Sequence, residues 1–220
     1  MSDVFEIPLH RGRVVRLLTW TASWLLFMHA VLWIWNYQFS EVEWYVLQLF
    51  DVNEKHNLPT WFSGFNLLVA TAILGTILLE KRRLEDPQTT RWVVLFFGFC
   101  YLSIDEIAGL HETVNSIVEP SWAWGGLVIT LVVGLYFIPF LRSLPRHTFI
   151  QFFTAGAVFV GGAVIMELVG EPLDSDSLAY AMSTLVEEGM EMFGIVLFVR
   201  AQLAYLMGGK ERGTLSLRTS

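Results

Sequence analysis

Six long apolar segments restrict the fold of this chain more than any other feature of its sequence. They cover approximately residues 14–36, 61–80, 91–113, 122–142, 149–169 and 178–206. A helix of about 20 residues crosses the hydrocarbon core of a bilayer, where backbone hydrogen bonds must be satisfied internally. With 54% hydrophobic and only 16% charged residues among 220, the chain is too apolar for an ordinary soluble domain. The sequence therefore predicts an all-α, polytopic membrane bundle with about six transmembrane helices.

The loops between these segments divide the charges by sign. If all six segments cross the membrane, every Lys and Arg except Lys55 falls on one side of it. Because basic loops stay in the cytoplasm, this pattern predicts cytoplasmic N and C termini in a multi-pass protein of the cell inner (plasma) membrane. We expect a cytoplasmic segment over 1–13, a six-span membrane domain over 14–206 and a cytoplasmic tail over 207–220.

Three carboxylates lie deep in the sixth apolar segment. Glu187, Glu188 and Glu191 share one face of a helix, since the helix makes one turn every 3.6 residues. A charged side chain in the middle of a bilayer costs about 2.5 kcal/mol or more. These acids therefore need partners, bound protons or a metal ion.

Two other apolar segments carry acids near their ends. The third contains Asp105, Glu106, His111 and Glu112, and the fifth contains Glu167. Asp105 and Glu112 are seven residues apart and lie on nearly the same face, whereas Glu106 and His111 lie to either side. All of these residues map to the outer halves of their helices. We expect them to meet the acids of the sixth segment in one pocket that opens toward the extracytoplasmic side.

Close helix packing is expected in the fifth segment. Gly156, Gly161 and Gly162 lie there, and small residues let two membrane helices approach each other closely.

Polar residues near the outer ends of the first two segments are candidates for a lid or relay over this pocket. They are His29, Asp51, Glu54, His56, Asn57 and Asn66. Structural roles are the alternative, because a lone buried His usually makes hydrogen bonds in the packing. Asn57 or Thr60 is suited to cap the helix that follows, with Pro59 in its first turn.

Carboxylates with a few imidazoles suit hard or borderline divalent metals, so we predict a site for one or two ions of iron, manganese or zinc. Its ligands would come from Asp105, Glu106, His111, Glu112, Glu167, Glu187, Glu188 and Glu191. The Glu-x-x-His pairs of di-metal helical bundles are missing, and the single cysteine, Cys100, excludes a cysteine cluster. Such a site would activate water or oxygen in a metal-dependent membrane enzyme that acts on a lipid-like or periplasmic substrate.

Two other classes of function fit the same residues. Acids at one depth cannot all be ionised, which is typical of a proton- or cation-coupled transporter. An accessory or structural subunit would instead pair its acids with basic residues of another protein. The lipid bilayer is the expected partner, and either a homo-oligomer or a membrane partner subunit is compatible with the sequence. Nucleic acid is not expected, because no basic stripe with interleaved aromatic residues occurs.

Three short motifs resemble those of an uncharacterised family of bacterial multi-pass membrane proteins. They are Asn57-Leu-Pro-Thr-Trp-Phe-Ser63, Ser103-Ile-Asp-Glu106 with His111-Glu112, and Glu187-Glu188 with Glu191-Met192. The resemblance covers these three motifs rather than the whole chain, and it implies no activity.

Overall fold

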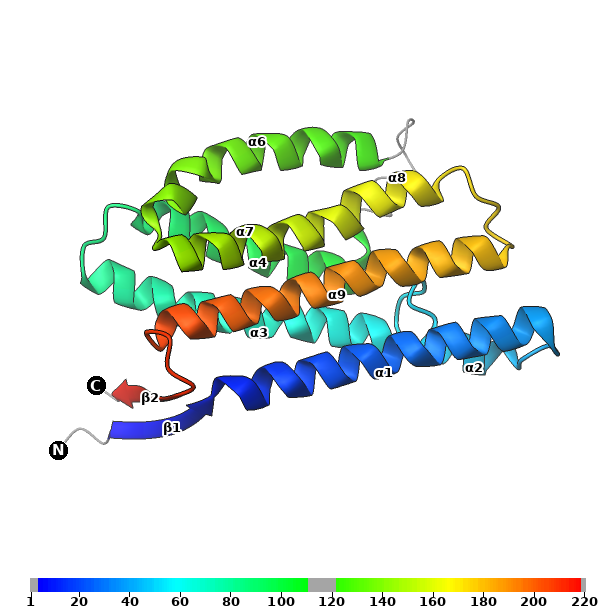
Figure 1. Ribbon diagram of the computed structural model, residues 1–220, viewed down its shortest axis with the longest axis horizontal. Helices are drawn as coiled ribbons and strands as arrows, with labels where there is room; N and C mark the ends of the chain where they lie inside the picture. The colour runs from blue at the N-terminus through cyan, green and yellow to red at the C-terminus, as the bar shows by residue number, and fades with distance from the viewer. Residues whose placement is uncertain (1–3, 111–121, 219–220) are drawn as a thin grey trace.

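The computed structural model describes residues 4–110 and 122–218, and long helices run back and forth through it (Figure 1). The long helices are α1 (Arg11–Gln38), α3 (Leu58–Arg83), α4 (Thr89–Ala108), α6 (Trp122–Ser143), α7 (Arg146–Val160) and α9 (Leu178–Leu206). The shorter elements are α2 (Trp44–Phe50), the π-helix η1 (Gly161–Met166), α8 (Glu167–Gly170), and the strands β1 (Val4–His10) and β2 (Arg212–Arg218). The helical fold class is therefore confirmed.

Five helices in the described part of the chain are long and apolar enough to cross a membrane. They are α1, α3, α6, the continuous stretch Arg146–Gly170, and α9. By length and composition the chain is thus a multi-pass membrane protein. The predicted third span corresponds to α4, a helix of 20 residues that packs against α3. Every stretch of 18 residues within α4 contains Arg91, Asp105 and Glu106, whereas each of the other five helices has a stretch of that length with at most two charged residues.

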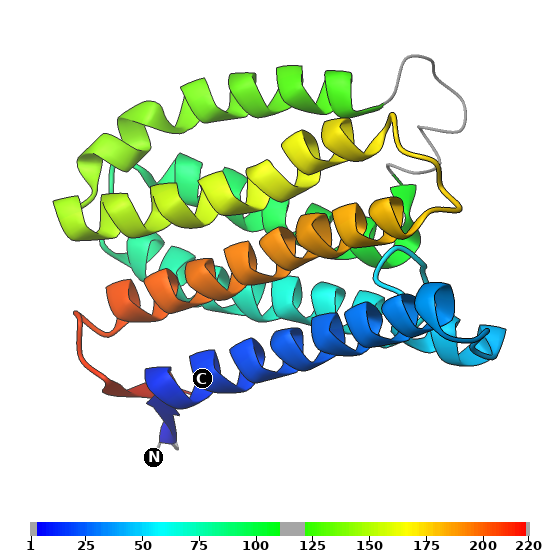
Figure 2. The same ribbon diagram turned by 45° about the vertical axis from the view of Figure 1, so that its right-hand side comes forward.

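The two ends of the chain meet at one end of the bundle. Strands β1 and β2 pair antiparallel, with Val4 opposite Arg218 and His10 opposite Arg212. Figures 1 and 2 show both termini at this end, which we call the terminal end. The opposite end, where α4 and α8 finish and α3 and α9 begin, carries Lys55, Glu106 and Glu187, and we call it the acidic end.

Helix α9 lies at the centre of the bundle. It packs against α1, α3, α7 and η1, and its Met192, Val199 and Leu203 are at most 2% exposed. Helix α6 instead lies at the edge in both views of the ribbon and exposes apolar side chains such as Val128 and Leu131. Such a surface is what contact with the lipid bilayer requires.

Glycines bring α7 and η1 unusually close to α9. A Cβ placed on Gly162 would lie 2.7 Å from the carbonyl oxygen of Glu187, and one on Gly194 would lie 2.7 Å from the backbone nitrogen of Phe159. The predicted close contact is confirmed for Gly162, whereas nothing lies within 4 Å of a Cβ on Gly156. The backbone of α9 at Glu187 and Glu191 is therefore held against η1.

Candidate functional site

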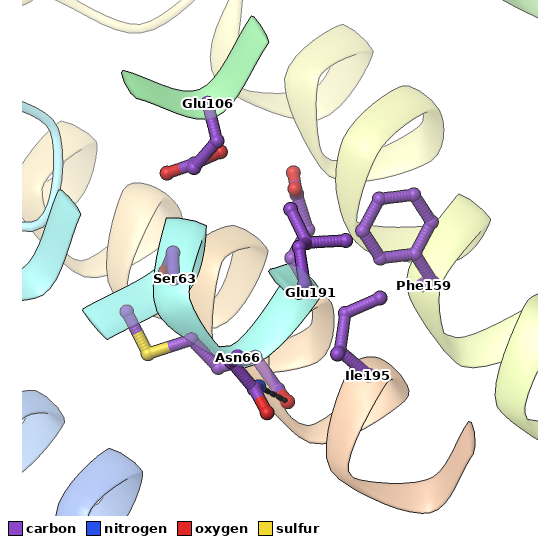
Figure 3. A pocket seen from close by; sticks show the side chains of 8 residues that line it. Ser63, Asn66, Glu106, Phe159, Glu191 and Ile195 are labelled. Atoms are coloured by element: carbon purple, nitrogen blue, oxygen red, sulfur yellow. Dashed lines mark hydrogen bonds between the residues drawn. The ribbon is translucent and has the colours of Figure 1, made fainter. Parts of the chain in front are cut away.

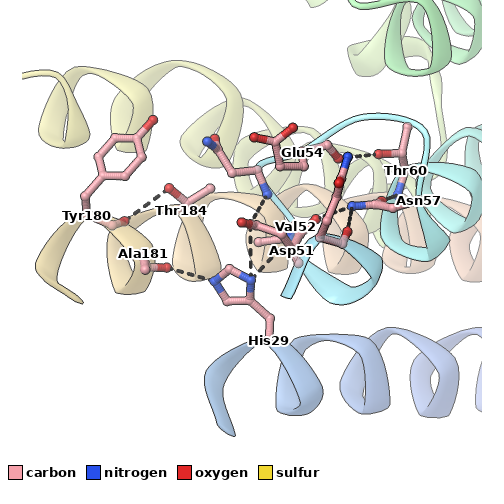
Figure 4. Close-up of polar contacts among 11 residues, drawn as sticks. His29, Asp51, Val52, Glu54, Asn57, Thr60, Tyr180, Ala181 and Thr184 are labelled. Carbon is pink, nitrogen blue, oxygen red and sulfur yellow. Dashed lines mark hydrogen bonds and ion pairs between the residues drawn. The ribbon is translucent and has the colours of Figure 1, made fainter. Parts of the chain in front are cut away.

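The loop between α2 and α3 is tied down by the cap of α3. Asn57 Oδ1 accepts the backbone N–H of Thr60 at 3.1 Å, and Asn57 Nδ2 donates to the carbonyl oxygens of Gln48 and Asp51 at 2.8 and 2.6 Å. The Thr60 hydroxyl donates to the carbonyl oxygen of Glu54 at 2.8 Å (Figure 4). Asn57 thus caps α3, as the sequence predicts, and fixes the path of the loop.

His29 joins α1 to this loop and to α9. Its Nδ1 accepts the backbone N–H of Val52 at 3.1 Å, so the remaining proton lies on Nε2, which is 3.1 Å from the carbonyl oxygen of Ala181 (Figure 4). His29 is only 1% exposed. Because backbone groups occupy both ring nitrogens, His29 has the hydrogen-bonded packing role that was the alternative to a relay.

Asp51 lies beside His29, outside the membrane-spanning helices. Its Oδ1 is 3.4 Å from His29 Nδ1 and accepts the backbone N–H of Asn53 at 2.9 Å. Burial raises the pKa of Asp51, although the Asn53 N–H and His29 act in the opposite direction. Asp51 therefore helps to hold the loop that follows α2 against His29 of α1.

Lys55 reaches from the loop to an acid of α4. Its Nζ lies 3.9 Å from Glu106 Oε1, and the two side chains are only 13% and 11% exposed. The pair is thus largely withdrawn from water, and removing either member would leave a costly buried charge. Lys55 was not among the predicted site residues. The sequence does distinguish Lys55, because it is the one basic residue that the predicted topology places on the opposite side of the membrane from all other Lys and Arg residues.

Glu187 on α9 and Glu167 on α8 lie near enough for each carboxyl group to act on the other as a like charge. Both acids also act electrostatically on Tyr180, which lies about two turns closer to the start of α9. Glu167 and Glu187 therefore form an acidic pair between α8 and α9.

Glu191 lies one helical turn further into α9 and lines a small pocket. The lining comes from α3, α4, α7 and α9, with Ser63, Asn66, Leu67, Glu106, Phe159, Glu191, Met192 and Ile195 (Figure 3). Its free space of about 10 Å³ holds roughly a single water molecule. Glu188, Glu106 and Glu187 act on Glu191 as like charges, and Lys55 acts on it as the opposite charge.

Two buried oxygen atoms at this pocket have no hydrogen-bond partner in the described structure. They are Asn66 Oδ1 and Ser63 Oγ, on residues that are 0% and 8% exposed. The amide nitrogen of Asn66 is used, because Asn66 Nδ2 donates to the carbonyl oxygen of Met192 at 3.1 Å. The residues that line the pocket thus include two acids, Glu106 and Glu191, and two residues with an unsatisfied neutral oxygen, Ser63 and Asn66.

The remaining predicted site residues are placed as follows. Asp105 is buried near the end of α4, and Glu54 and His56 are exposed in the loop. His111 and Glu112 lie outside the described residues. Within residues 4–110 and 122–218, no three His, Cys, Asp or Glu side chains are arranged so that they could hold a metal ion. The predicted iron, manganese or zinc centre is thus not seen there.

Comparisons with known proteins identify the family but no activity. A family model described as a domain of unknown function (DUF8692) matches residues 18–206, which include every site residue described above. No curated protein and no solved structure matches the chain. Because the family match extends over most of the chain, from α1 to the end of α9, this multi-pass membrane protein belongs to the DUF8692 family.

Proposed function

We propose that this protein is a proton- or cation-coupled transporter that accepts its coupling ion at the acidic end. In this proposal Glu106, Glu167, Glu187, Glu188 and Glu191 act together as one carboxylate cluster. The observation that carries the proposal is the ion pair between Lys55 and Glu106, because a loop cation has been drawn into a site that is otherwise lined with acids. An ammonium in that position is a resident counter-ion that a mobile cation can replace.

The balance of charge supports this function. Five carboxylates would oppose a single ammonium group if all of them were ionised, and such an excess is not tolerated away from water. Glu167 and Glu188 act on Glu187 as like charges, and Glu106, Glu187 and Glu188 act on Glu191 in the same way. The site therefore gains stability from any further positive charge that enters it, which is the property that a coupled transporter uses.

We further propose that the acidic end faces the extracytoplasmic side and the terminal end the cytoplasm. The basic residues Lys81, Arg82 and Arg83 close α3 at the terminal end, and Arg11 opens α1 there. Basic loops are retained in the cytoplasm. A reporter active only in the cytoplasm, fused after residue 220, should therefore be active, and the same reporter inserted between Asp174 and Asp176 should be inactive. The reverse pattern would contradict this orientation.

Ion flux in proteoliposomes tests the proposed transport. Vesicles with the purified protein and an internal pH dye are exposed to an inward gradient of protons or Na⁺ under a valinomycin-clamped potential. The wild type should move protons or exchange them for Na⁺, and Glu191→Gln should reduce the flux to that of empty vesicles. Glu171→Gln is the matched control, because Glu171 is an exposed acid at the same end. Equal flux in wild-type and empty vesicles under every gradient would refute transport.

A metal-dependent membrane enzyme is the second candidate. It is favoured by the meeting of Glu106 from α4 and Glu191 from α9 at one pocket, since carboxylates from different helices are the usual ligands of metals in helical bundles. The enzyme would act on a lipid-like or periplasmic substrate. Elemental analysis of the purified protein should then find iron, manganese or zinc at one or two ions per chain. Loss of that metal in Glu191→Gln would support the enzyme, and metal-free wild type would refute it.

A further inference from the structure

We infer that α2 is a re-entrant helix whose exposed face lies against the acyl chains of the lipid leaflet at the acidic end. The inference concerns the outer surface of the protein and does not depend on the proposed transport. It starts from the composition of α2, because its sequence, Trp44-Tyr-Val-Leu-Gln-Leu-Phe50, contains no charged residue and none that is buried. Trp44, Tyr45 and Leu49 are 71%, 58% and 44% exposed. Large apolar side chains that are exposed together indicate an apolar partner.

Hydrogen bonds at both ends of α2 fix its direction along α1. Before α2, the backbone N–H of Val42 donates to Asn36 Oδ1 at 2.8 Å. After α2, the backbone N–H of Val52 donates to His29 Nδ1 at 3.1 Å. Asn36 and His29 are separated by about 10.5 Å along the axis of α1, which is also the length of a helix of seven residues. Helix α2 therefore runs antiparallel to α1, and both ribbon views place it beside the last turns of α1 (Figures 1 and 2).

The charge pattern of α1 relates these hydrogen bonds to the depth of the bilayer. The stretch from Leu17 to Gln38 has no Asp, Glu, Lys or Arg, and its length of about 33 Å matches a hydrocarbon core of about 30 Å. Arg16 precedes this stretch and Glu41 follows it. The boundary of the core at the acidic end therefore lies near Gln38, and His29 lies about 14 Å below it. Since the end of α2 is bonded at the level of His29, α2 descends into the leaflet and does not lie flat on its surface.

The end of α2 borders an apolar face of α1 that is itself exposed. Trp20, Trp24 and Phe27 lie within about 60° of one another around α1, and they are 74%, 49% and 62% exposed. Phe50, the last residue of α2, packs edge-on against Trp24 with ring centroids 5.4 Å apart. This face belongs to a helix that is long and apolar enough to cross the membrane, so lipid covers it. The same acyl chains therefore reach α2.

The loop that follows α2 meets the requirement for irregular backbone at this depth. Such backbone is tolerated in a membrane only where it is buried in protein or lines a water-filled space. Asn57 and Thr60 donate hydrogen bonds to carbonyl oxygens of the loop. His29 and Asp51 accept two of its backbone N–H groups. The exposed Glu54 lies on the side of the loop away from His29 and α1 (Figure 4), so we expect it to face water at the acidic end.

Spin labels on single cysteines test whether α2 faces lipid, water or protein. Tyr45→Cys and Leu49→Cys are each made in the full-length protein with Cys100→Ser, labelled, and reconstituted into phosphatidylcholine vesicles. Power-saturation EPR measures how often each label collides with oxygen, which concentrates in lipid, and with a water-soluble nickel chelate. Val128→Cys on the exposed face of α6 is the lipid reference, and Ser175→Cys in the exposed loop before α9 is the water reference.

The labels on α2 should behave like the label at Val128→Cys, with high oxygen and low nickel accessibility. Leu49 lies about 6 Å deeper than Tyr45 on a re-entrant helix, so the ratio of oxygen to nickel accessibility should rise from Tyr45→Cys to Leu49→Cys. Equal ratios at the two positions would show a helix that lies flat on the membrane and would overturn the re-entrant path. Nickel accessibility as high as in Ser175→Cys would place α2 in water. Low accessibility to both probes would show that a second copy or another protein covers α2, and either result overturns the lipid contact.

A label in the loop separates the two faces of this segment. Glu54→Cys lies only five residues beyond Leu49, yet it should resemble Ser175→Cys because its side chain faces water. A lipid-like label at position 54 would overturn the inference, since the native carboxylate would then lie in hydrocarbon. The substituted residues on α2 and at position 54 are exposed, so each variant should fold and elute as a single species like the Cys100→Ser parent.

Discussion

Adding one methyl group at Gly162 should separate η1 from α9 and destabilise the protein. In Gly162→Ala the new Cβ would lie 2.7 Å from the carbonyl oxygen of Glu187, 2.9 Å from Glu191 Cγ and 3.1 Å from the backbone nitrogen of Glu191. Two of these atoms belong to the backbone of α9 and cannot rotate away. The helices must therefore move apart, which is the overpacking that usually costs about 1–3 kcal/mol.

A second glycine of the same segment supplies the comparison for this prediction. Nothing lies within 4 Å of a Cβ on Gly156, and this residue is exposed. Ala is preferred to Gly inside a helix by about 1 kcal/mol, so Gly156→Ala should be neutral or slightly stabilising. The two variants make the same chemical change, and we expect them to differ by about 2–4 kcal/mol in the free energy of unfolding.

Thermal unfolding in detergent, followed by tryptophan fluorescence, measures this difference. One kcal/mol corresponds to roughly 2–4 °C in Tm for a chain of this length, so Gly162→Ala should unfold about 5–15 °C below Gly156→Ala. The same displacement moves Glu191 out of its pocket, and Gly162→Ala should also reduce the proposed ion flux in vesicles. Equal Tm values for the two variants would show that α7, η1 and α9 are not in close contact, and the geometry of the site would be wrong.

Three further predictions concern the loop and its junction with α1. His29→Leu removes the partners of the Val52 N–H and the Ala181 carbonyl, so its Tm should fall by the equivalent of about 2–4 kcal/mol, and an unchanged Tm would contradict the role of His29. Asn57→Ala removes the cap of α3 and should cost about 1 kcal/mol, with faster hydrogen exchange over residues 51–57 than in wild type; equal exchange would contradict it. Burial raises the pKa of Asp51 above its ordinary value of 3.8, so the folded state binds this proton more tightly than the unfolded state does. Below pH 3.8 the bound proton contributes its full stabilisation of the folded state. This stabilisation is lost as the pH rises through the pKa that Asp51 has in the folded protein. The Tm of wild type minus that of Asp51→Asn should therefore increase as the pH is lowered from about 7 to about 4, and a constant difference would contradict the shift.

The helices could be predicted because their signal is local. Length and apolar composition were sufficient to find five of the six predicted spans as long apolar helices, since an isolated stretch of chain carries both properties. Helix α4 is too charged to be recognised as a membrane span from its composition, because Asp105 and Glu106 lie within it. The acids that make this helix interesting for function are the ones that weaken its hydrophobic signal.

The contact between Lys55 and Glu106 could not be predicted from local patterns. It depends on the path of the loop over residues 51–57, and that path is set by bonds to distant residues. His29 holds Val52, and Asn57 holds the carbonyl oxygens of Gln48 and Asp51. Asp51, Asn57 and their neighbours are predicted from the sequence to form a lid or relay over the acids. In the structure the side chain of Asn57 serves the backbone of its own loop, and Lys55 is the residue that reaches an acid.

The helical register of α4 also limited the prediction. Straight-helix geometry pairs Asp105 with Glu112, but α4 ends at Ala108 and Gly109 adopts a left-handed conformation with φ 60°. A register extrapolated beyond Gly109 has no basis, because the left-handed residue redirects the chain. Within α4 it is Glu106 that lines the pocket. The prediction for Glu112 lies outside the described residues and stays a prediction.

The proposed function assigns different tasks to acids at different depths of α9. Glu187 lies toward the loop and near Glu167, whereas Glu191 lies about 6 Å deeper, where it lines a pocket together with Ser63 and Asn66. In this proposal an ion that enters from the acidic end meets Glu167 and Glu187 before it meets the pocket. Neighbouring carboxylates away from water cannot all be ionised, and a proton bound between these two acids would have to leave before a cation could pass them favourably. The proposal thus couples proton release to cation entry through the spacing of Glu187 and Glu191 on one helix.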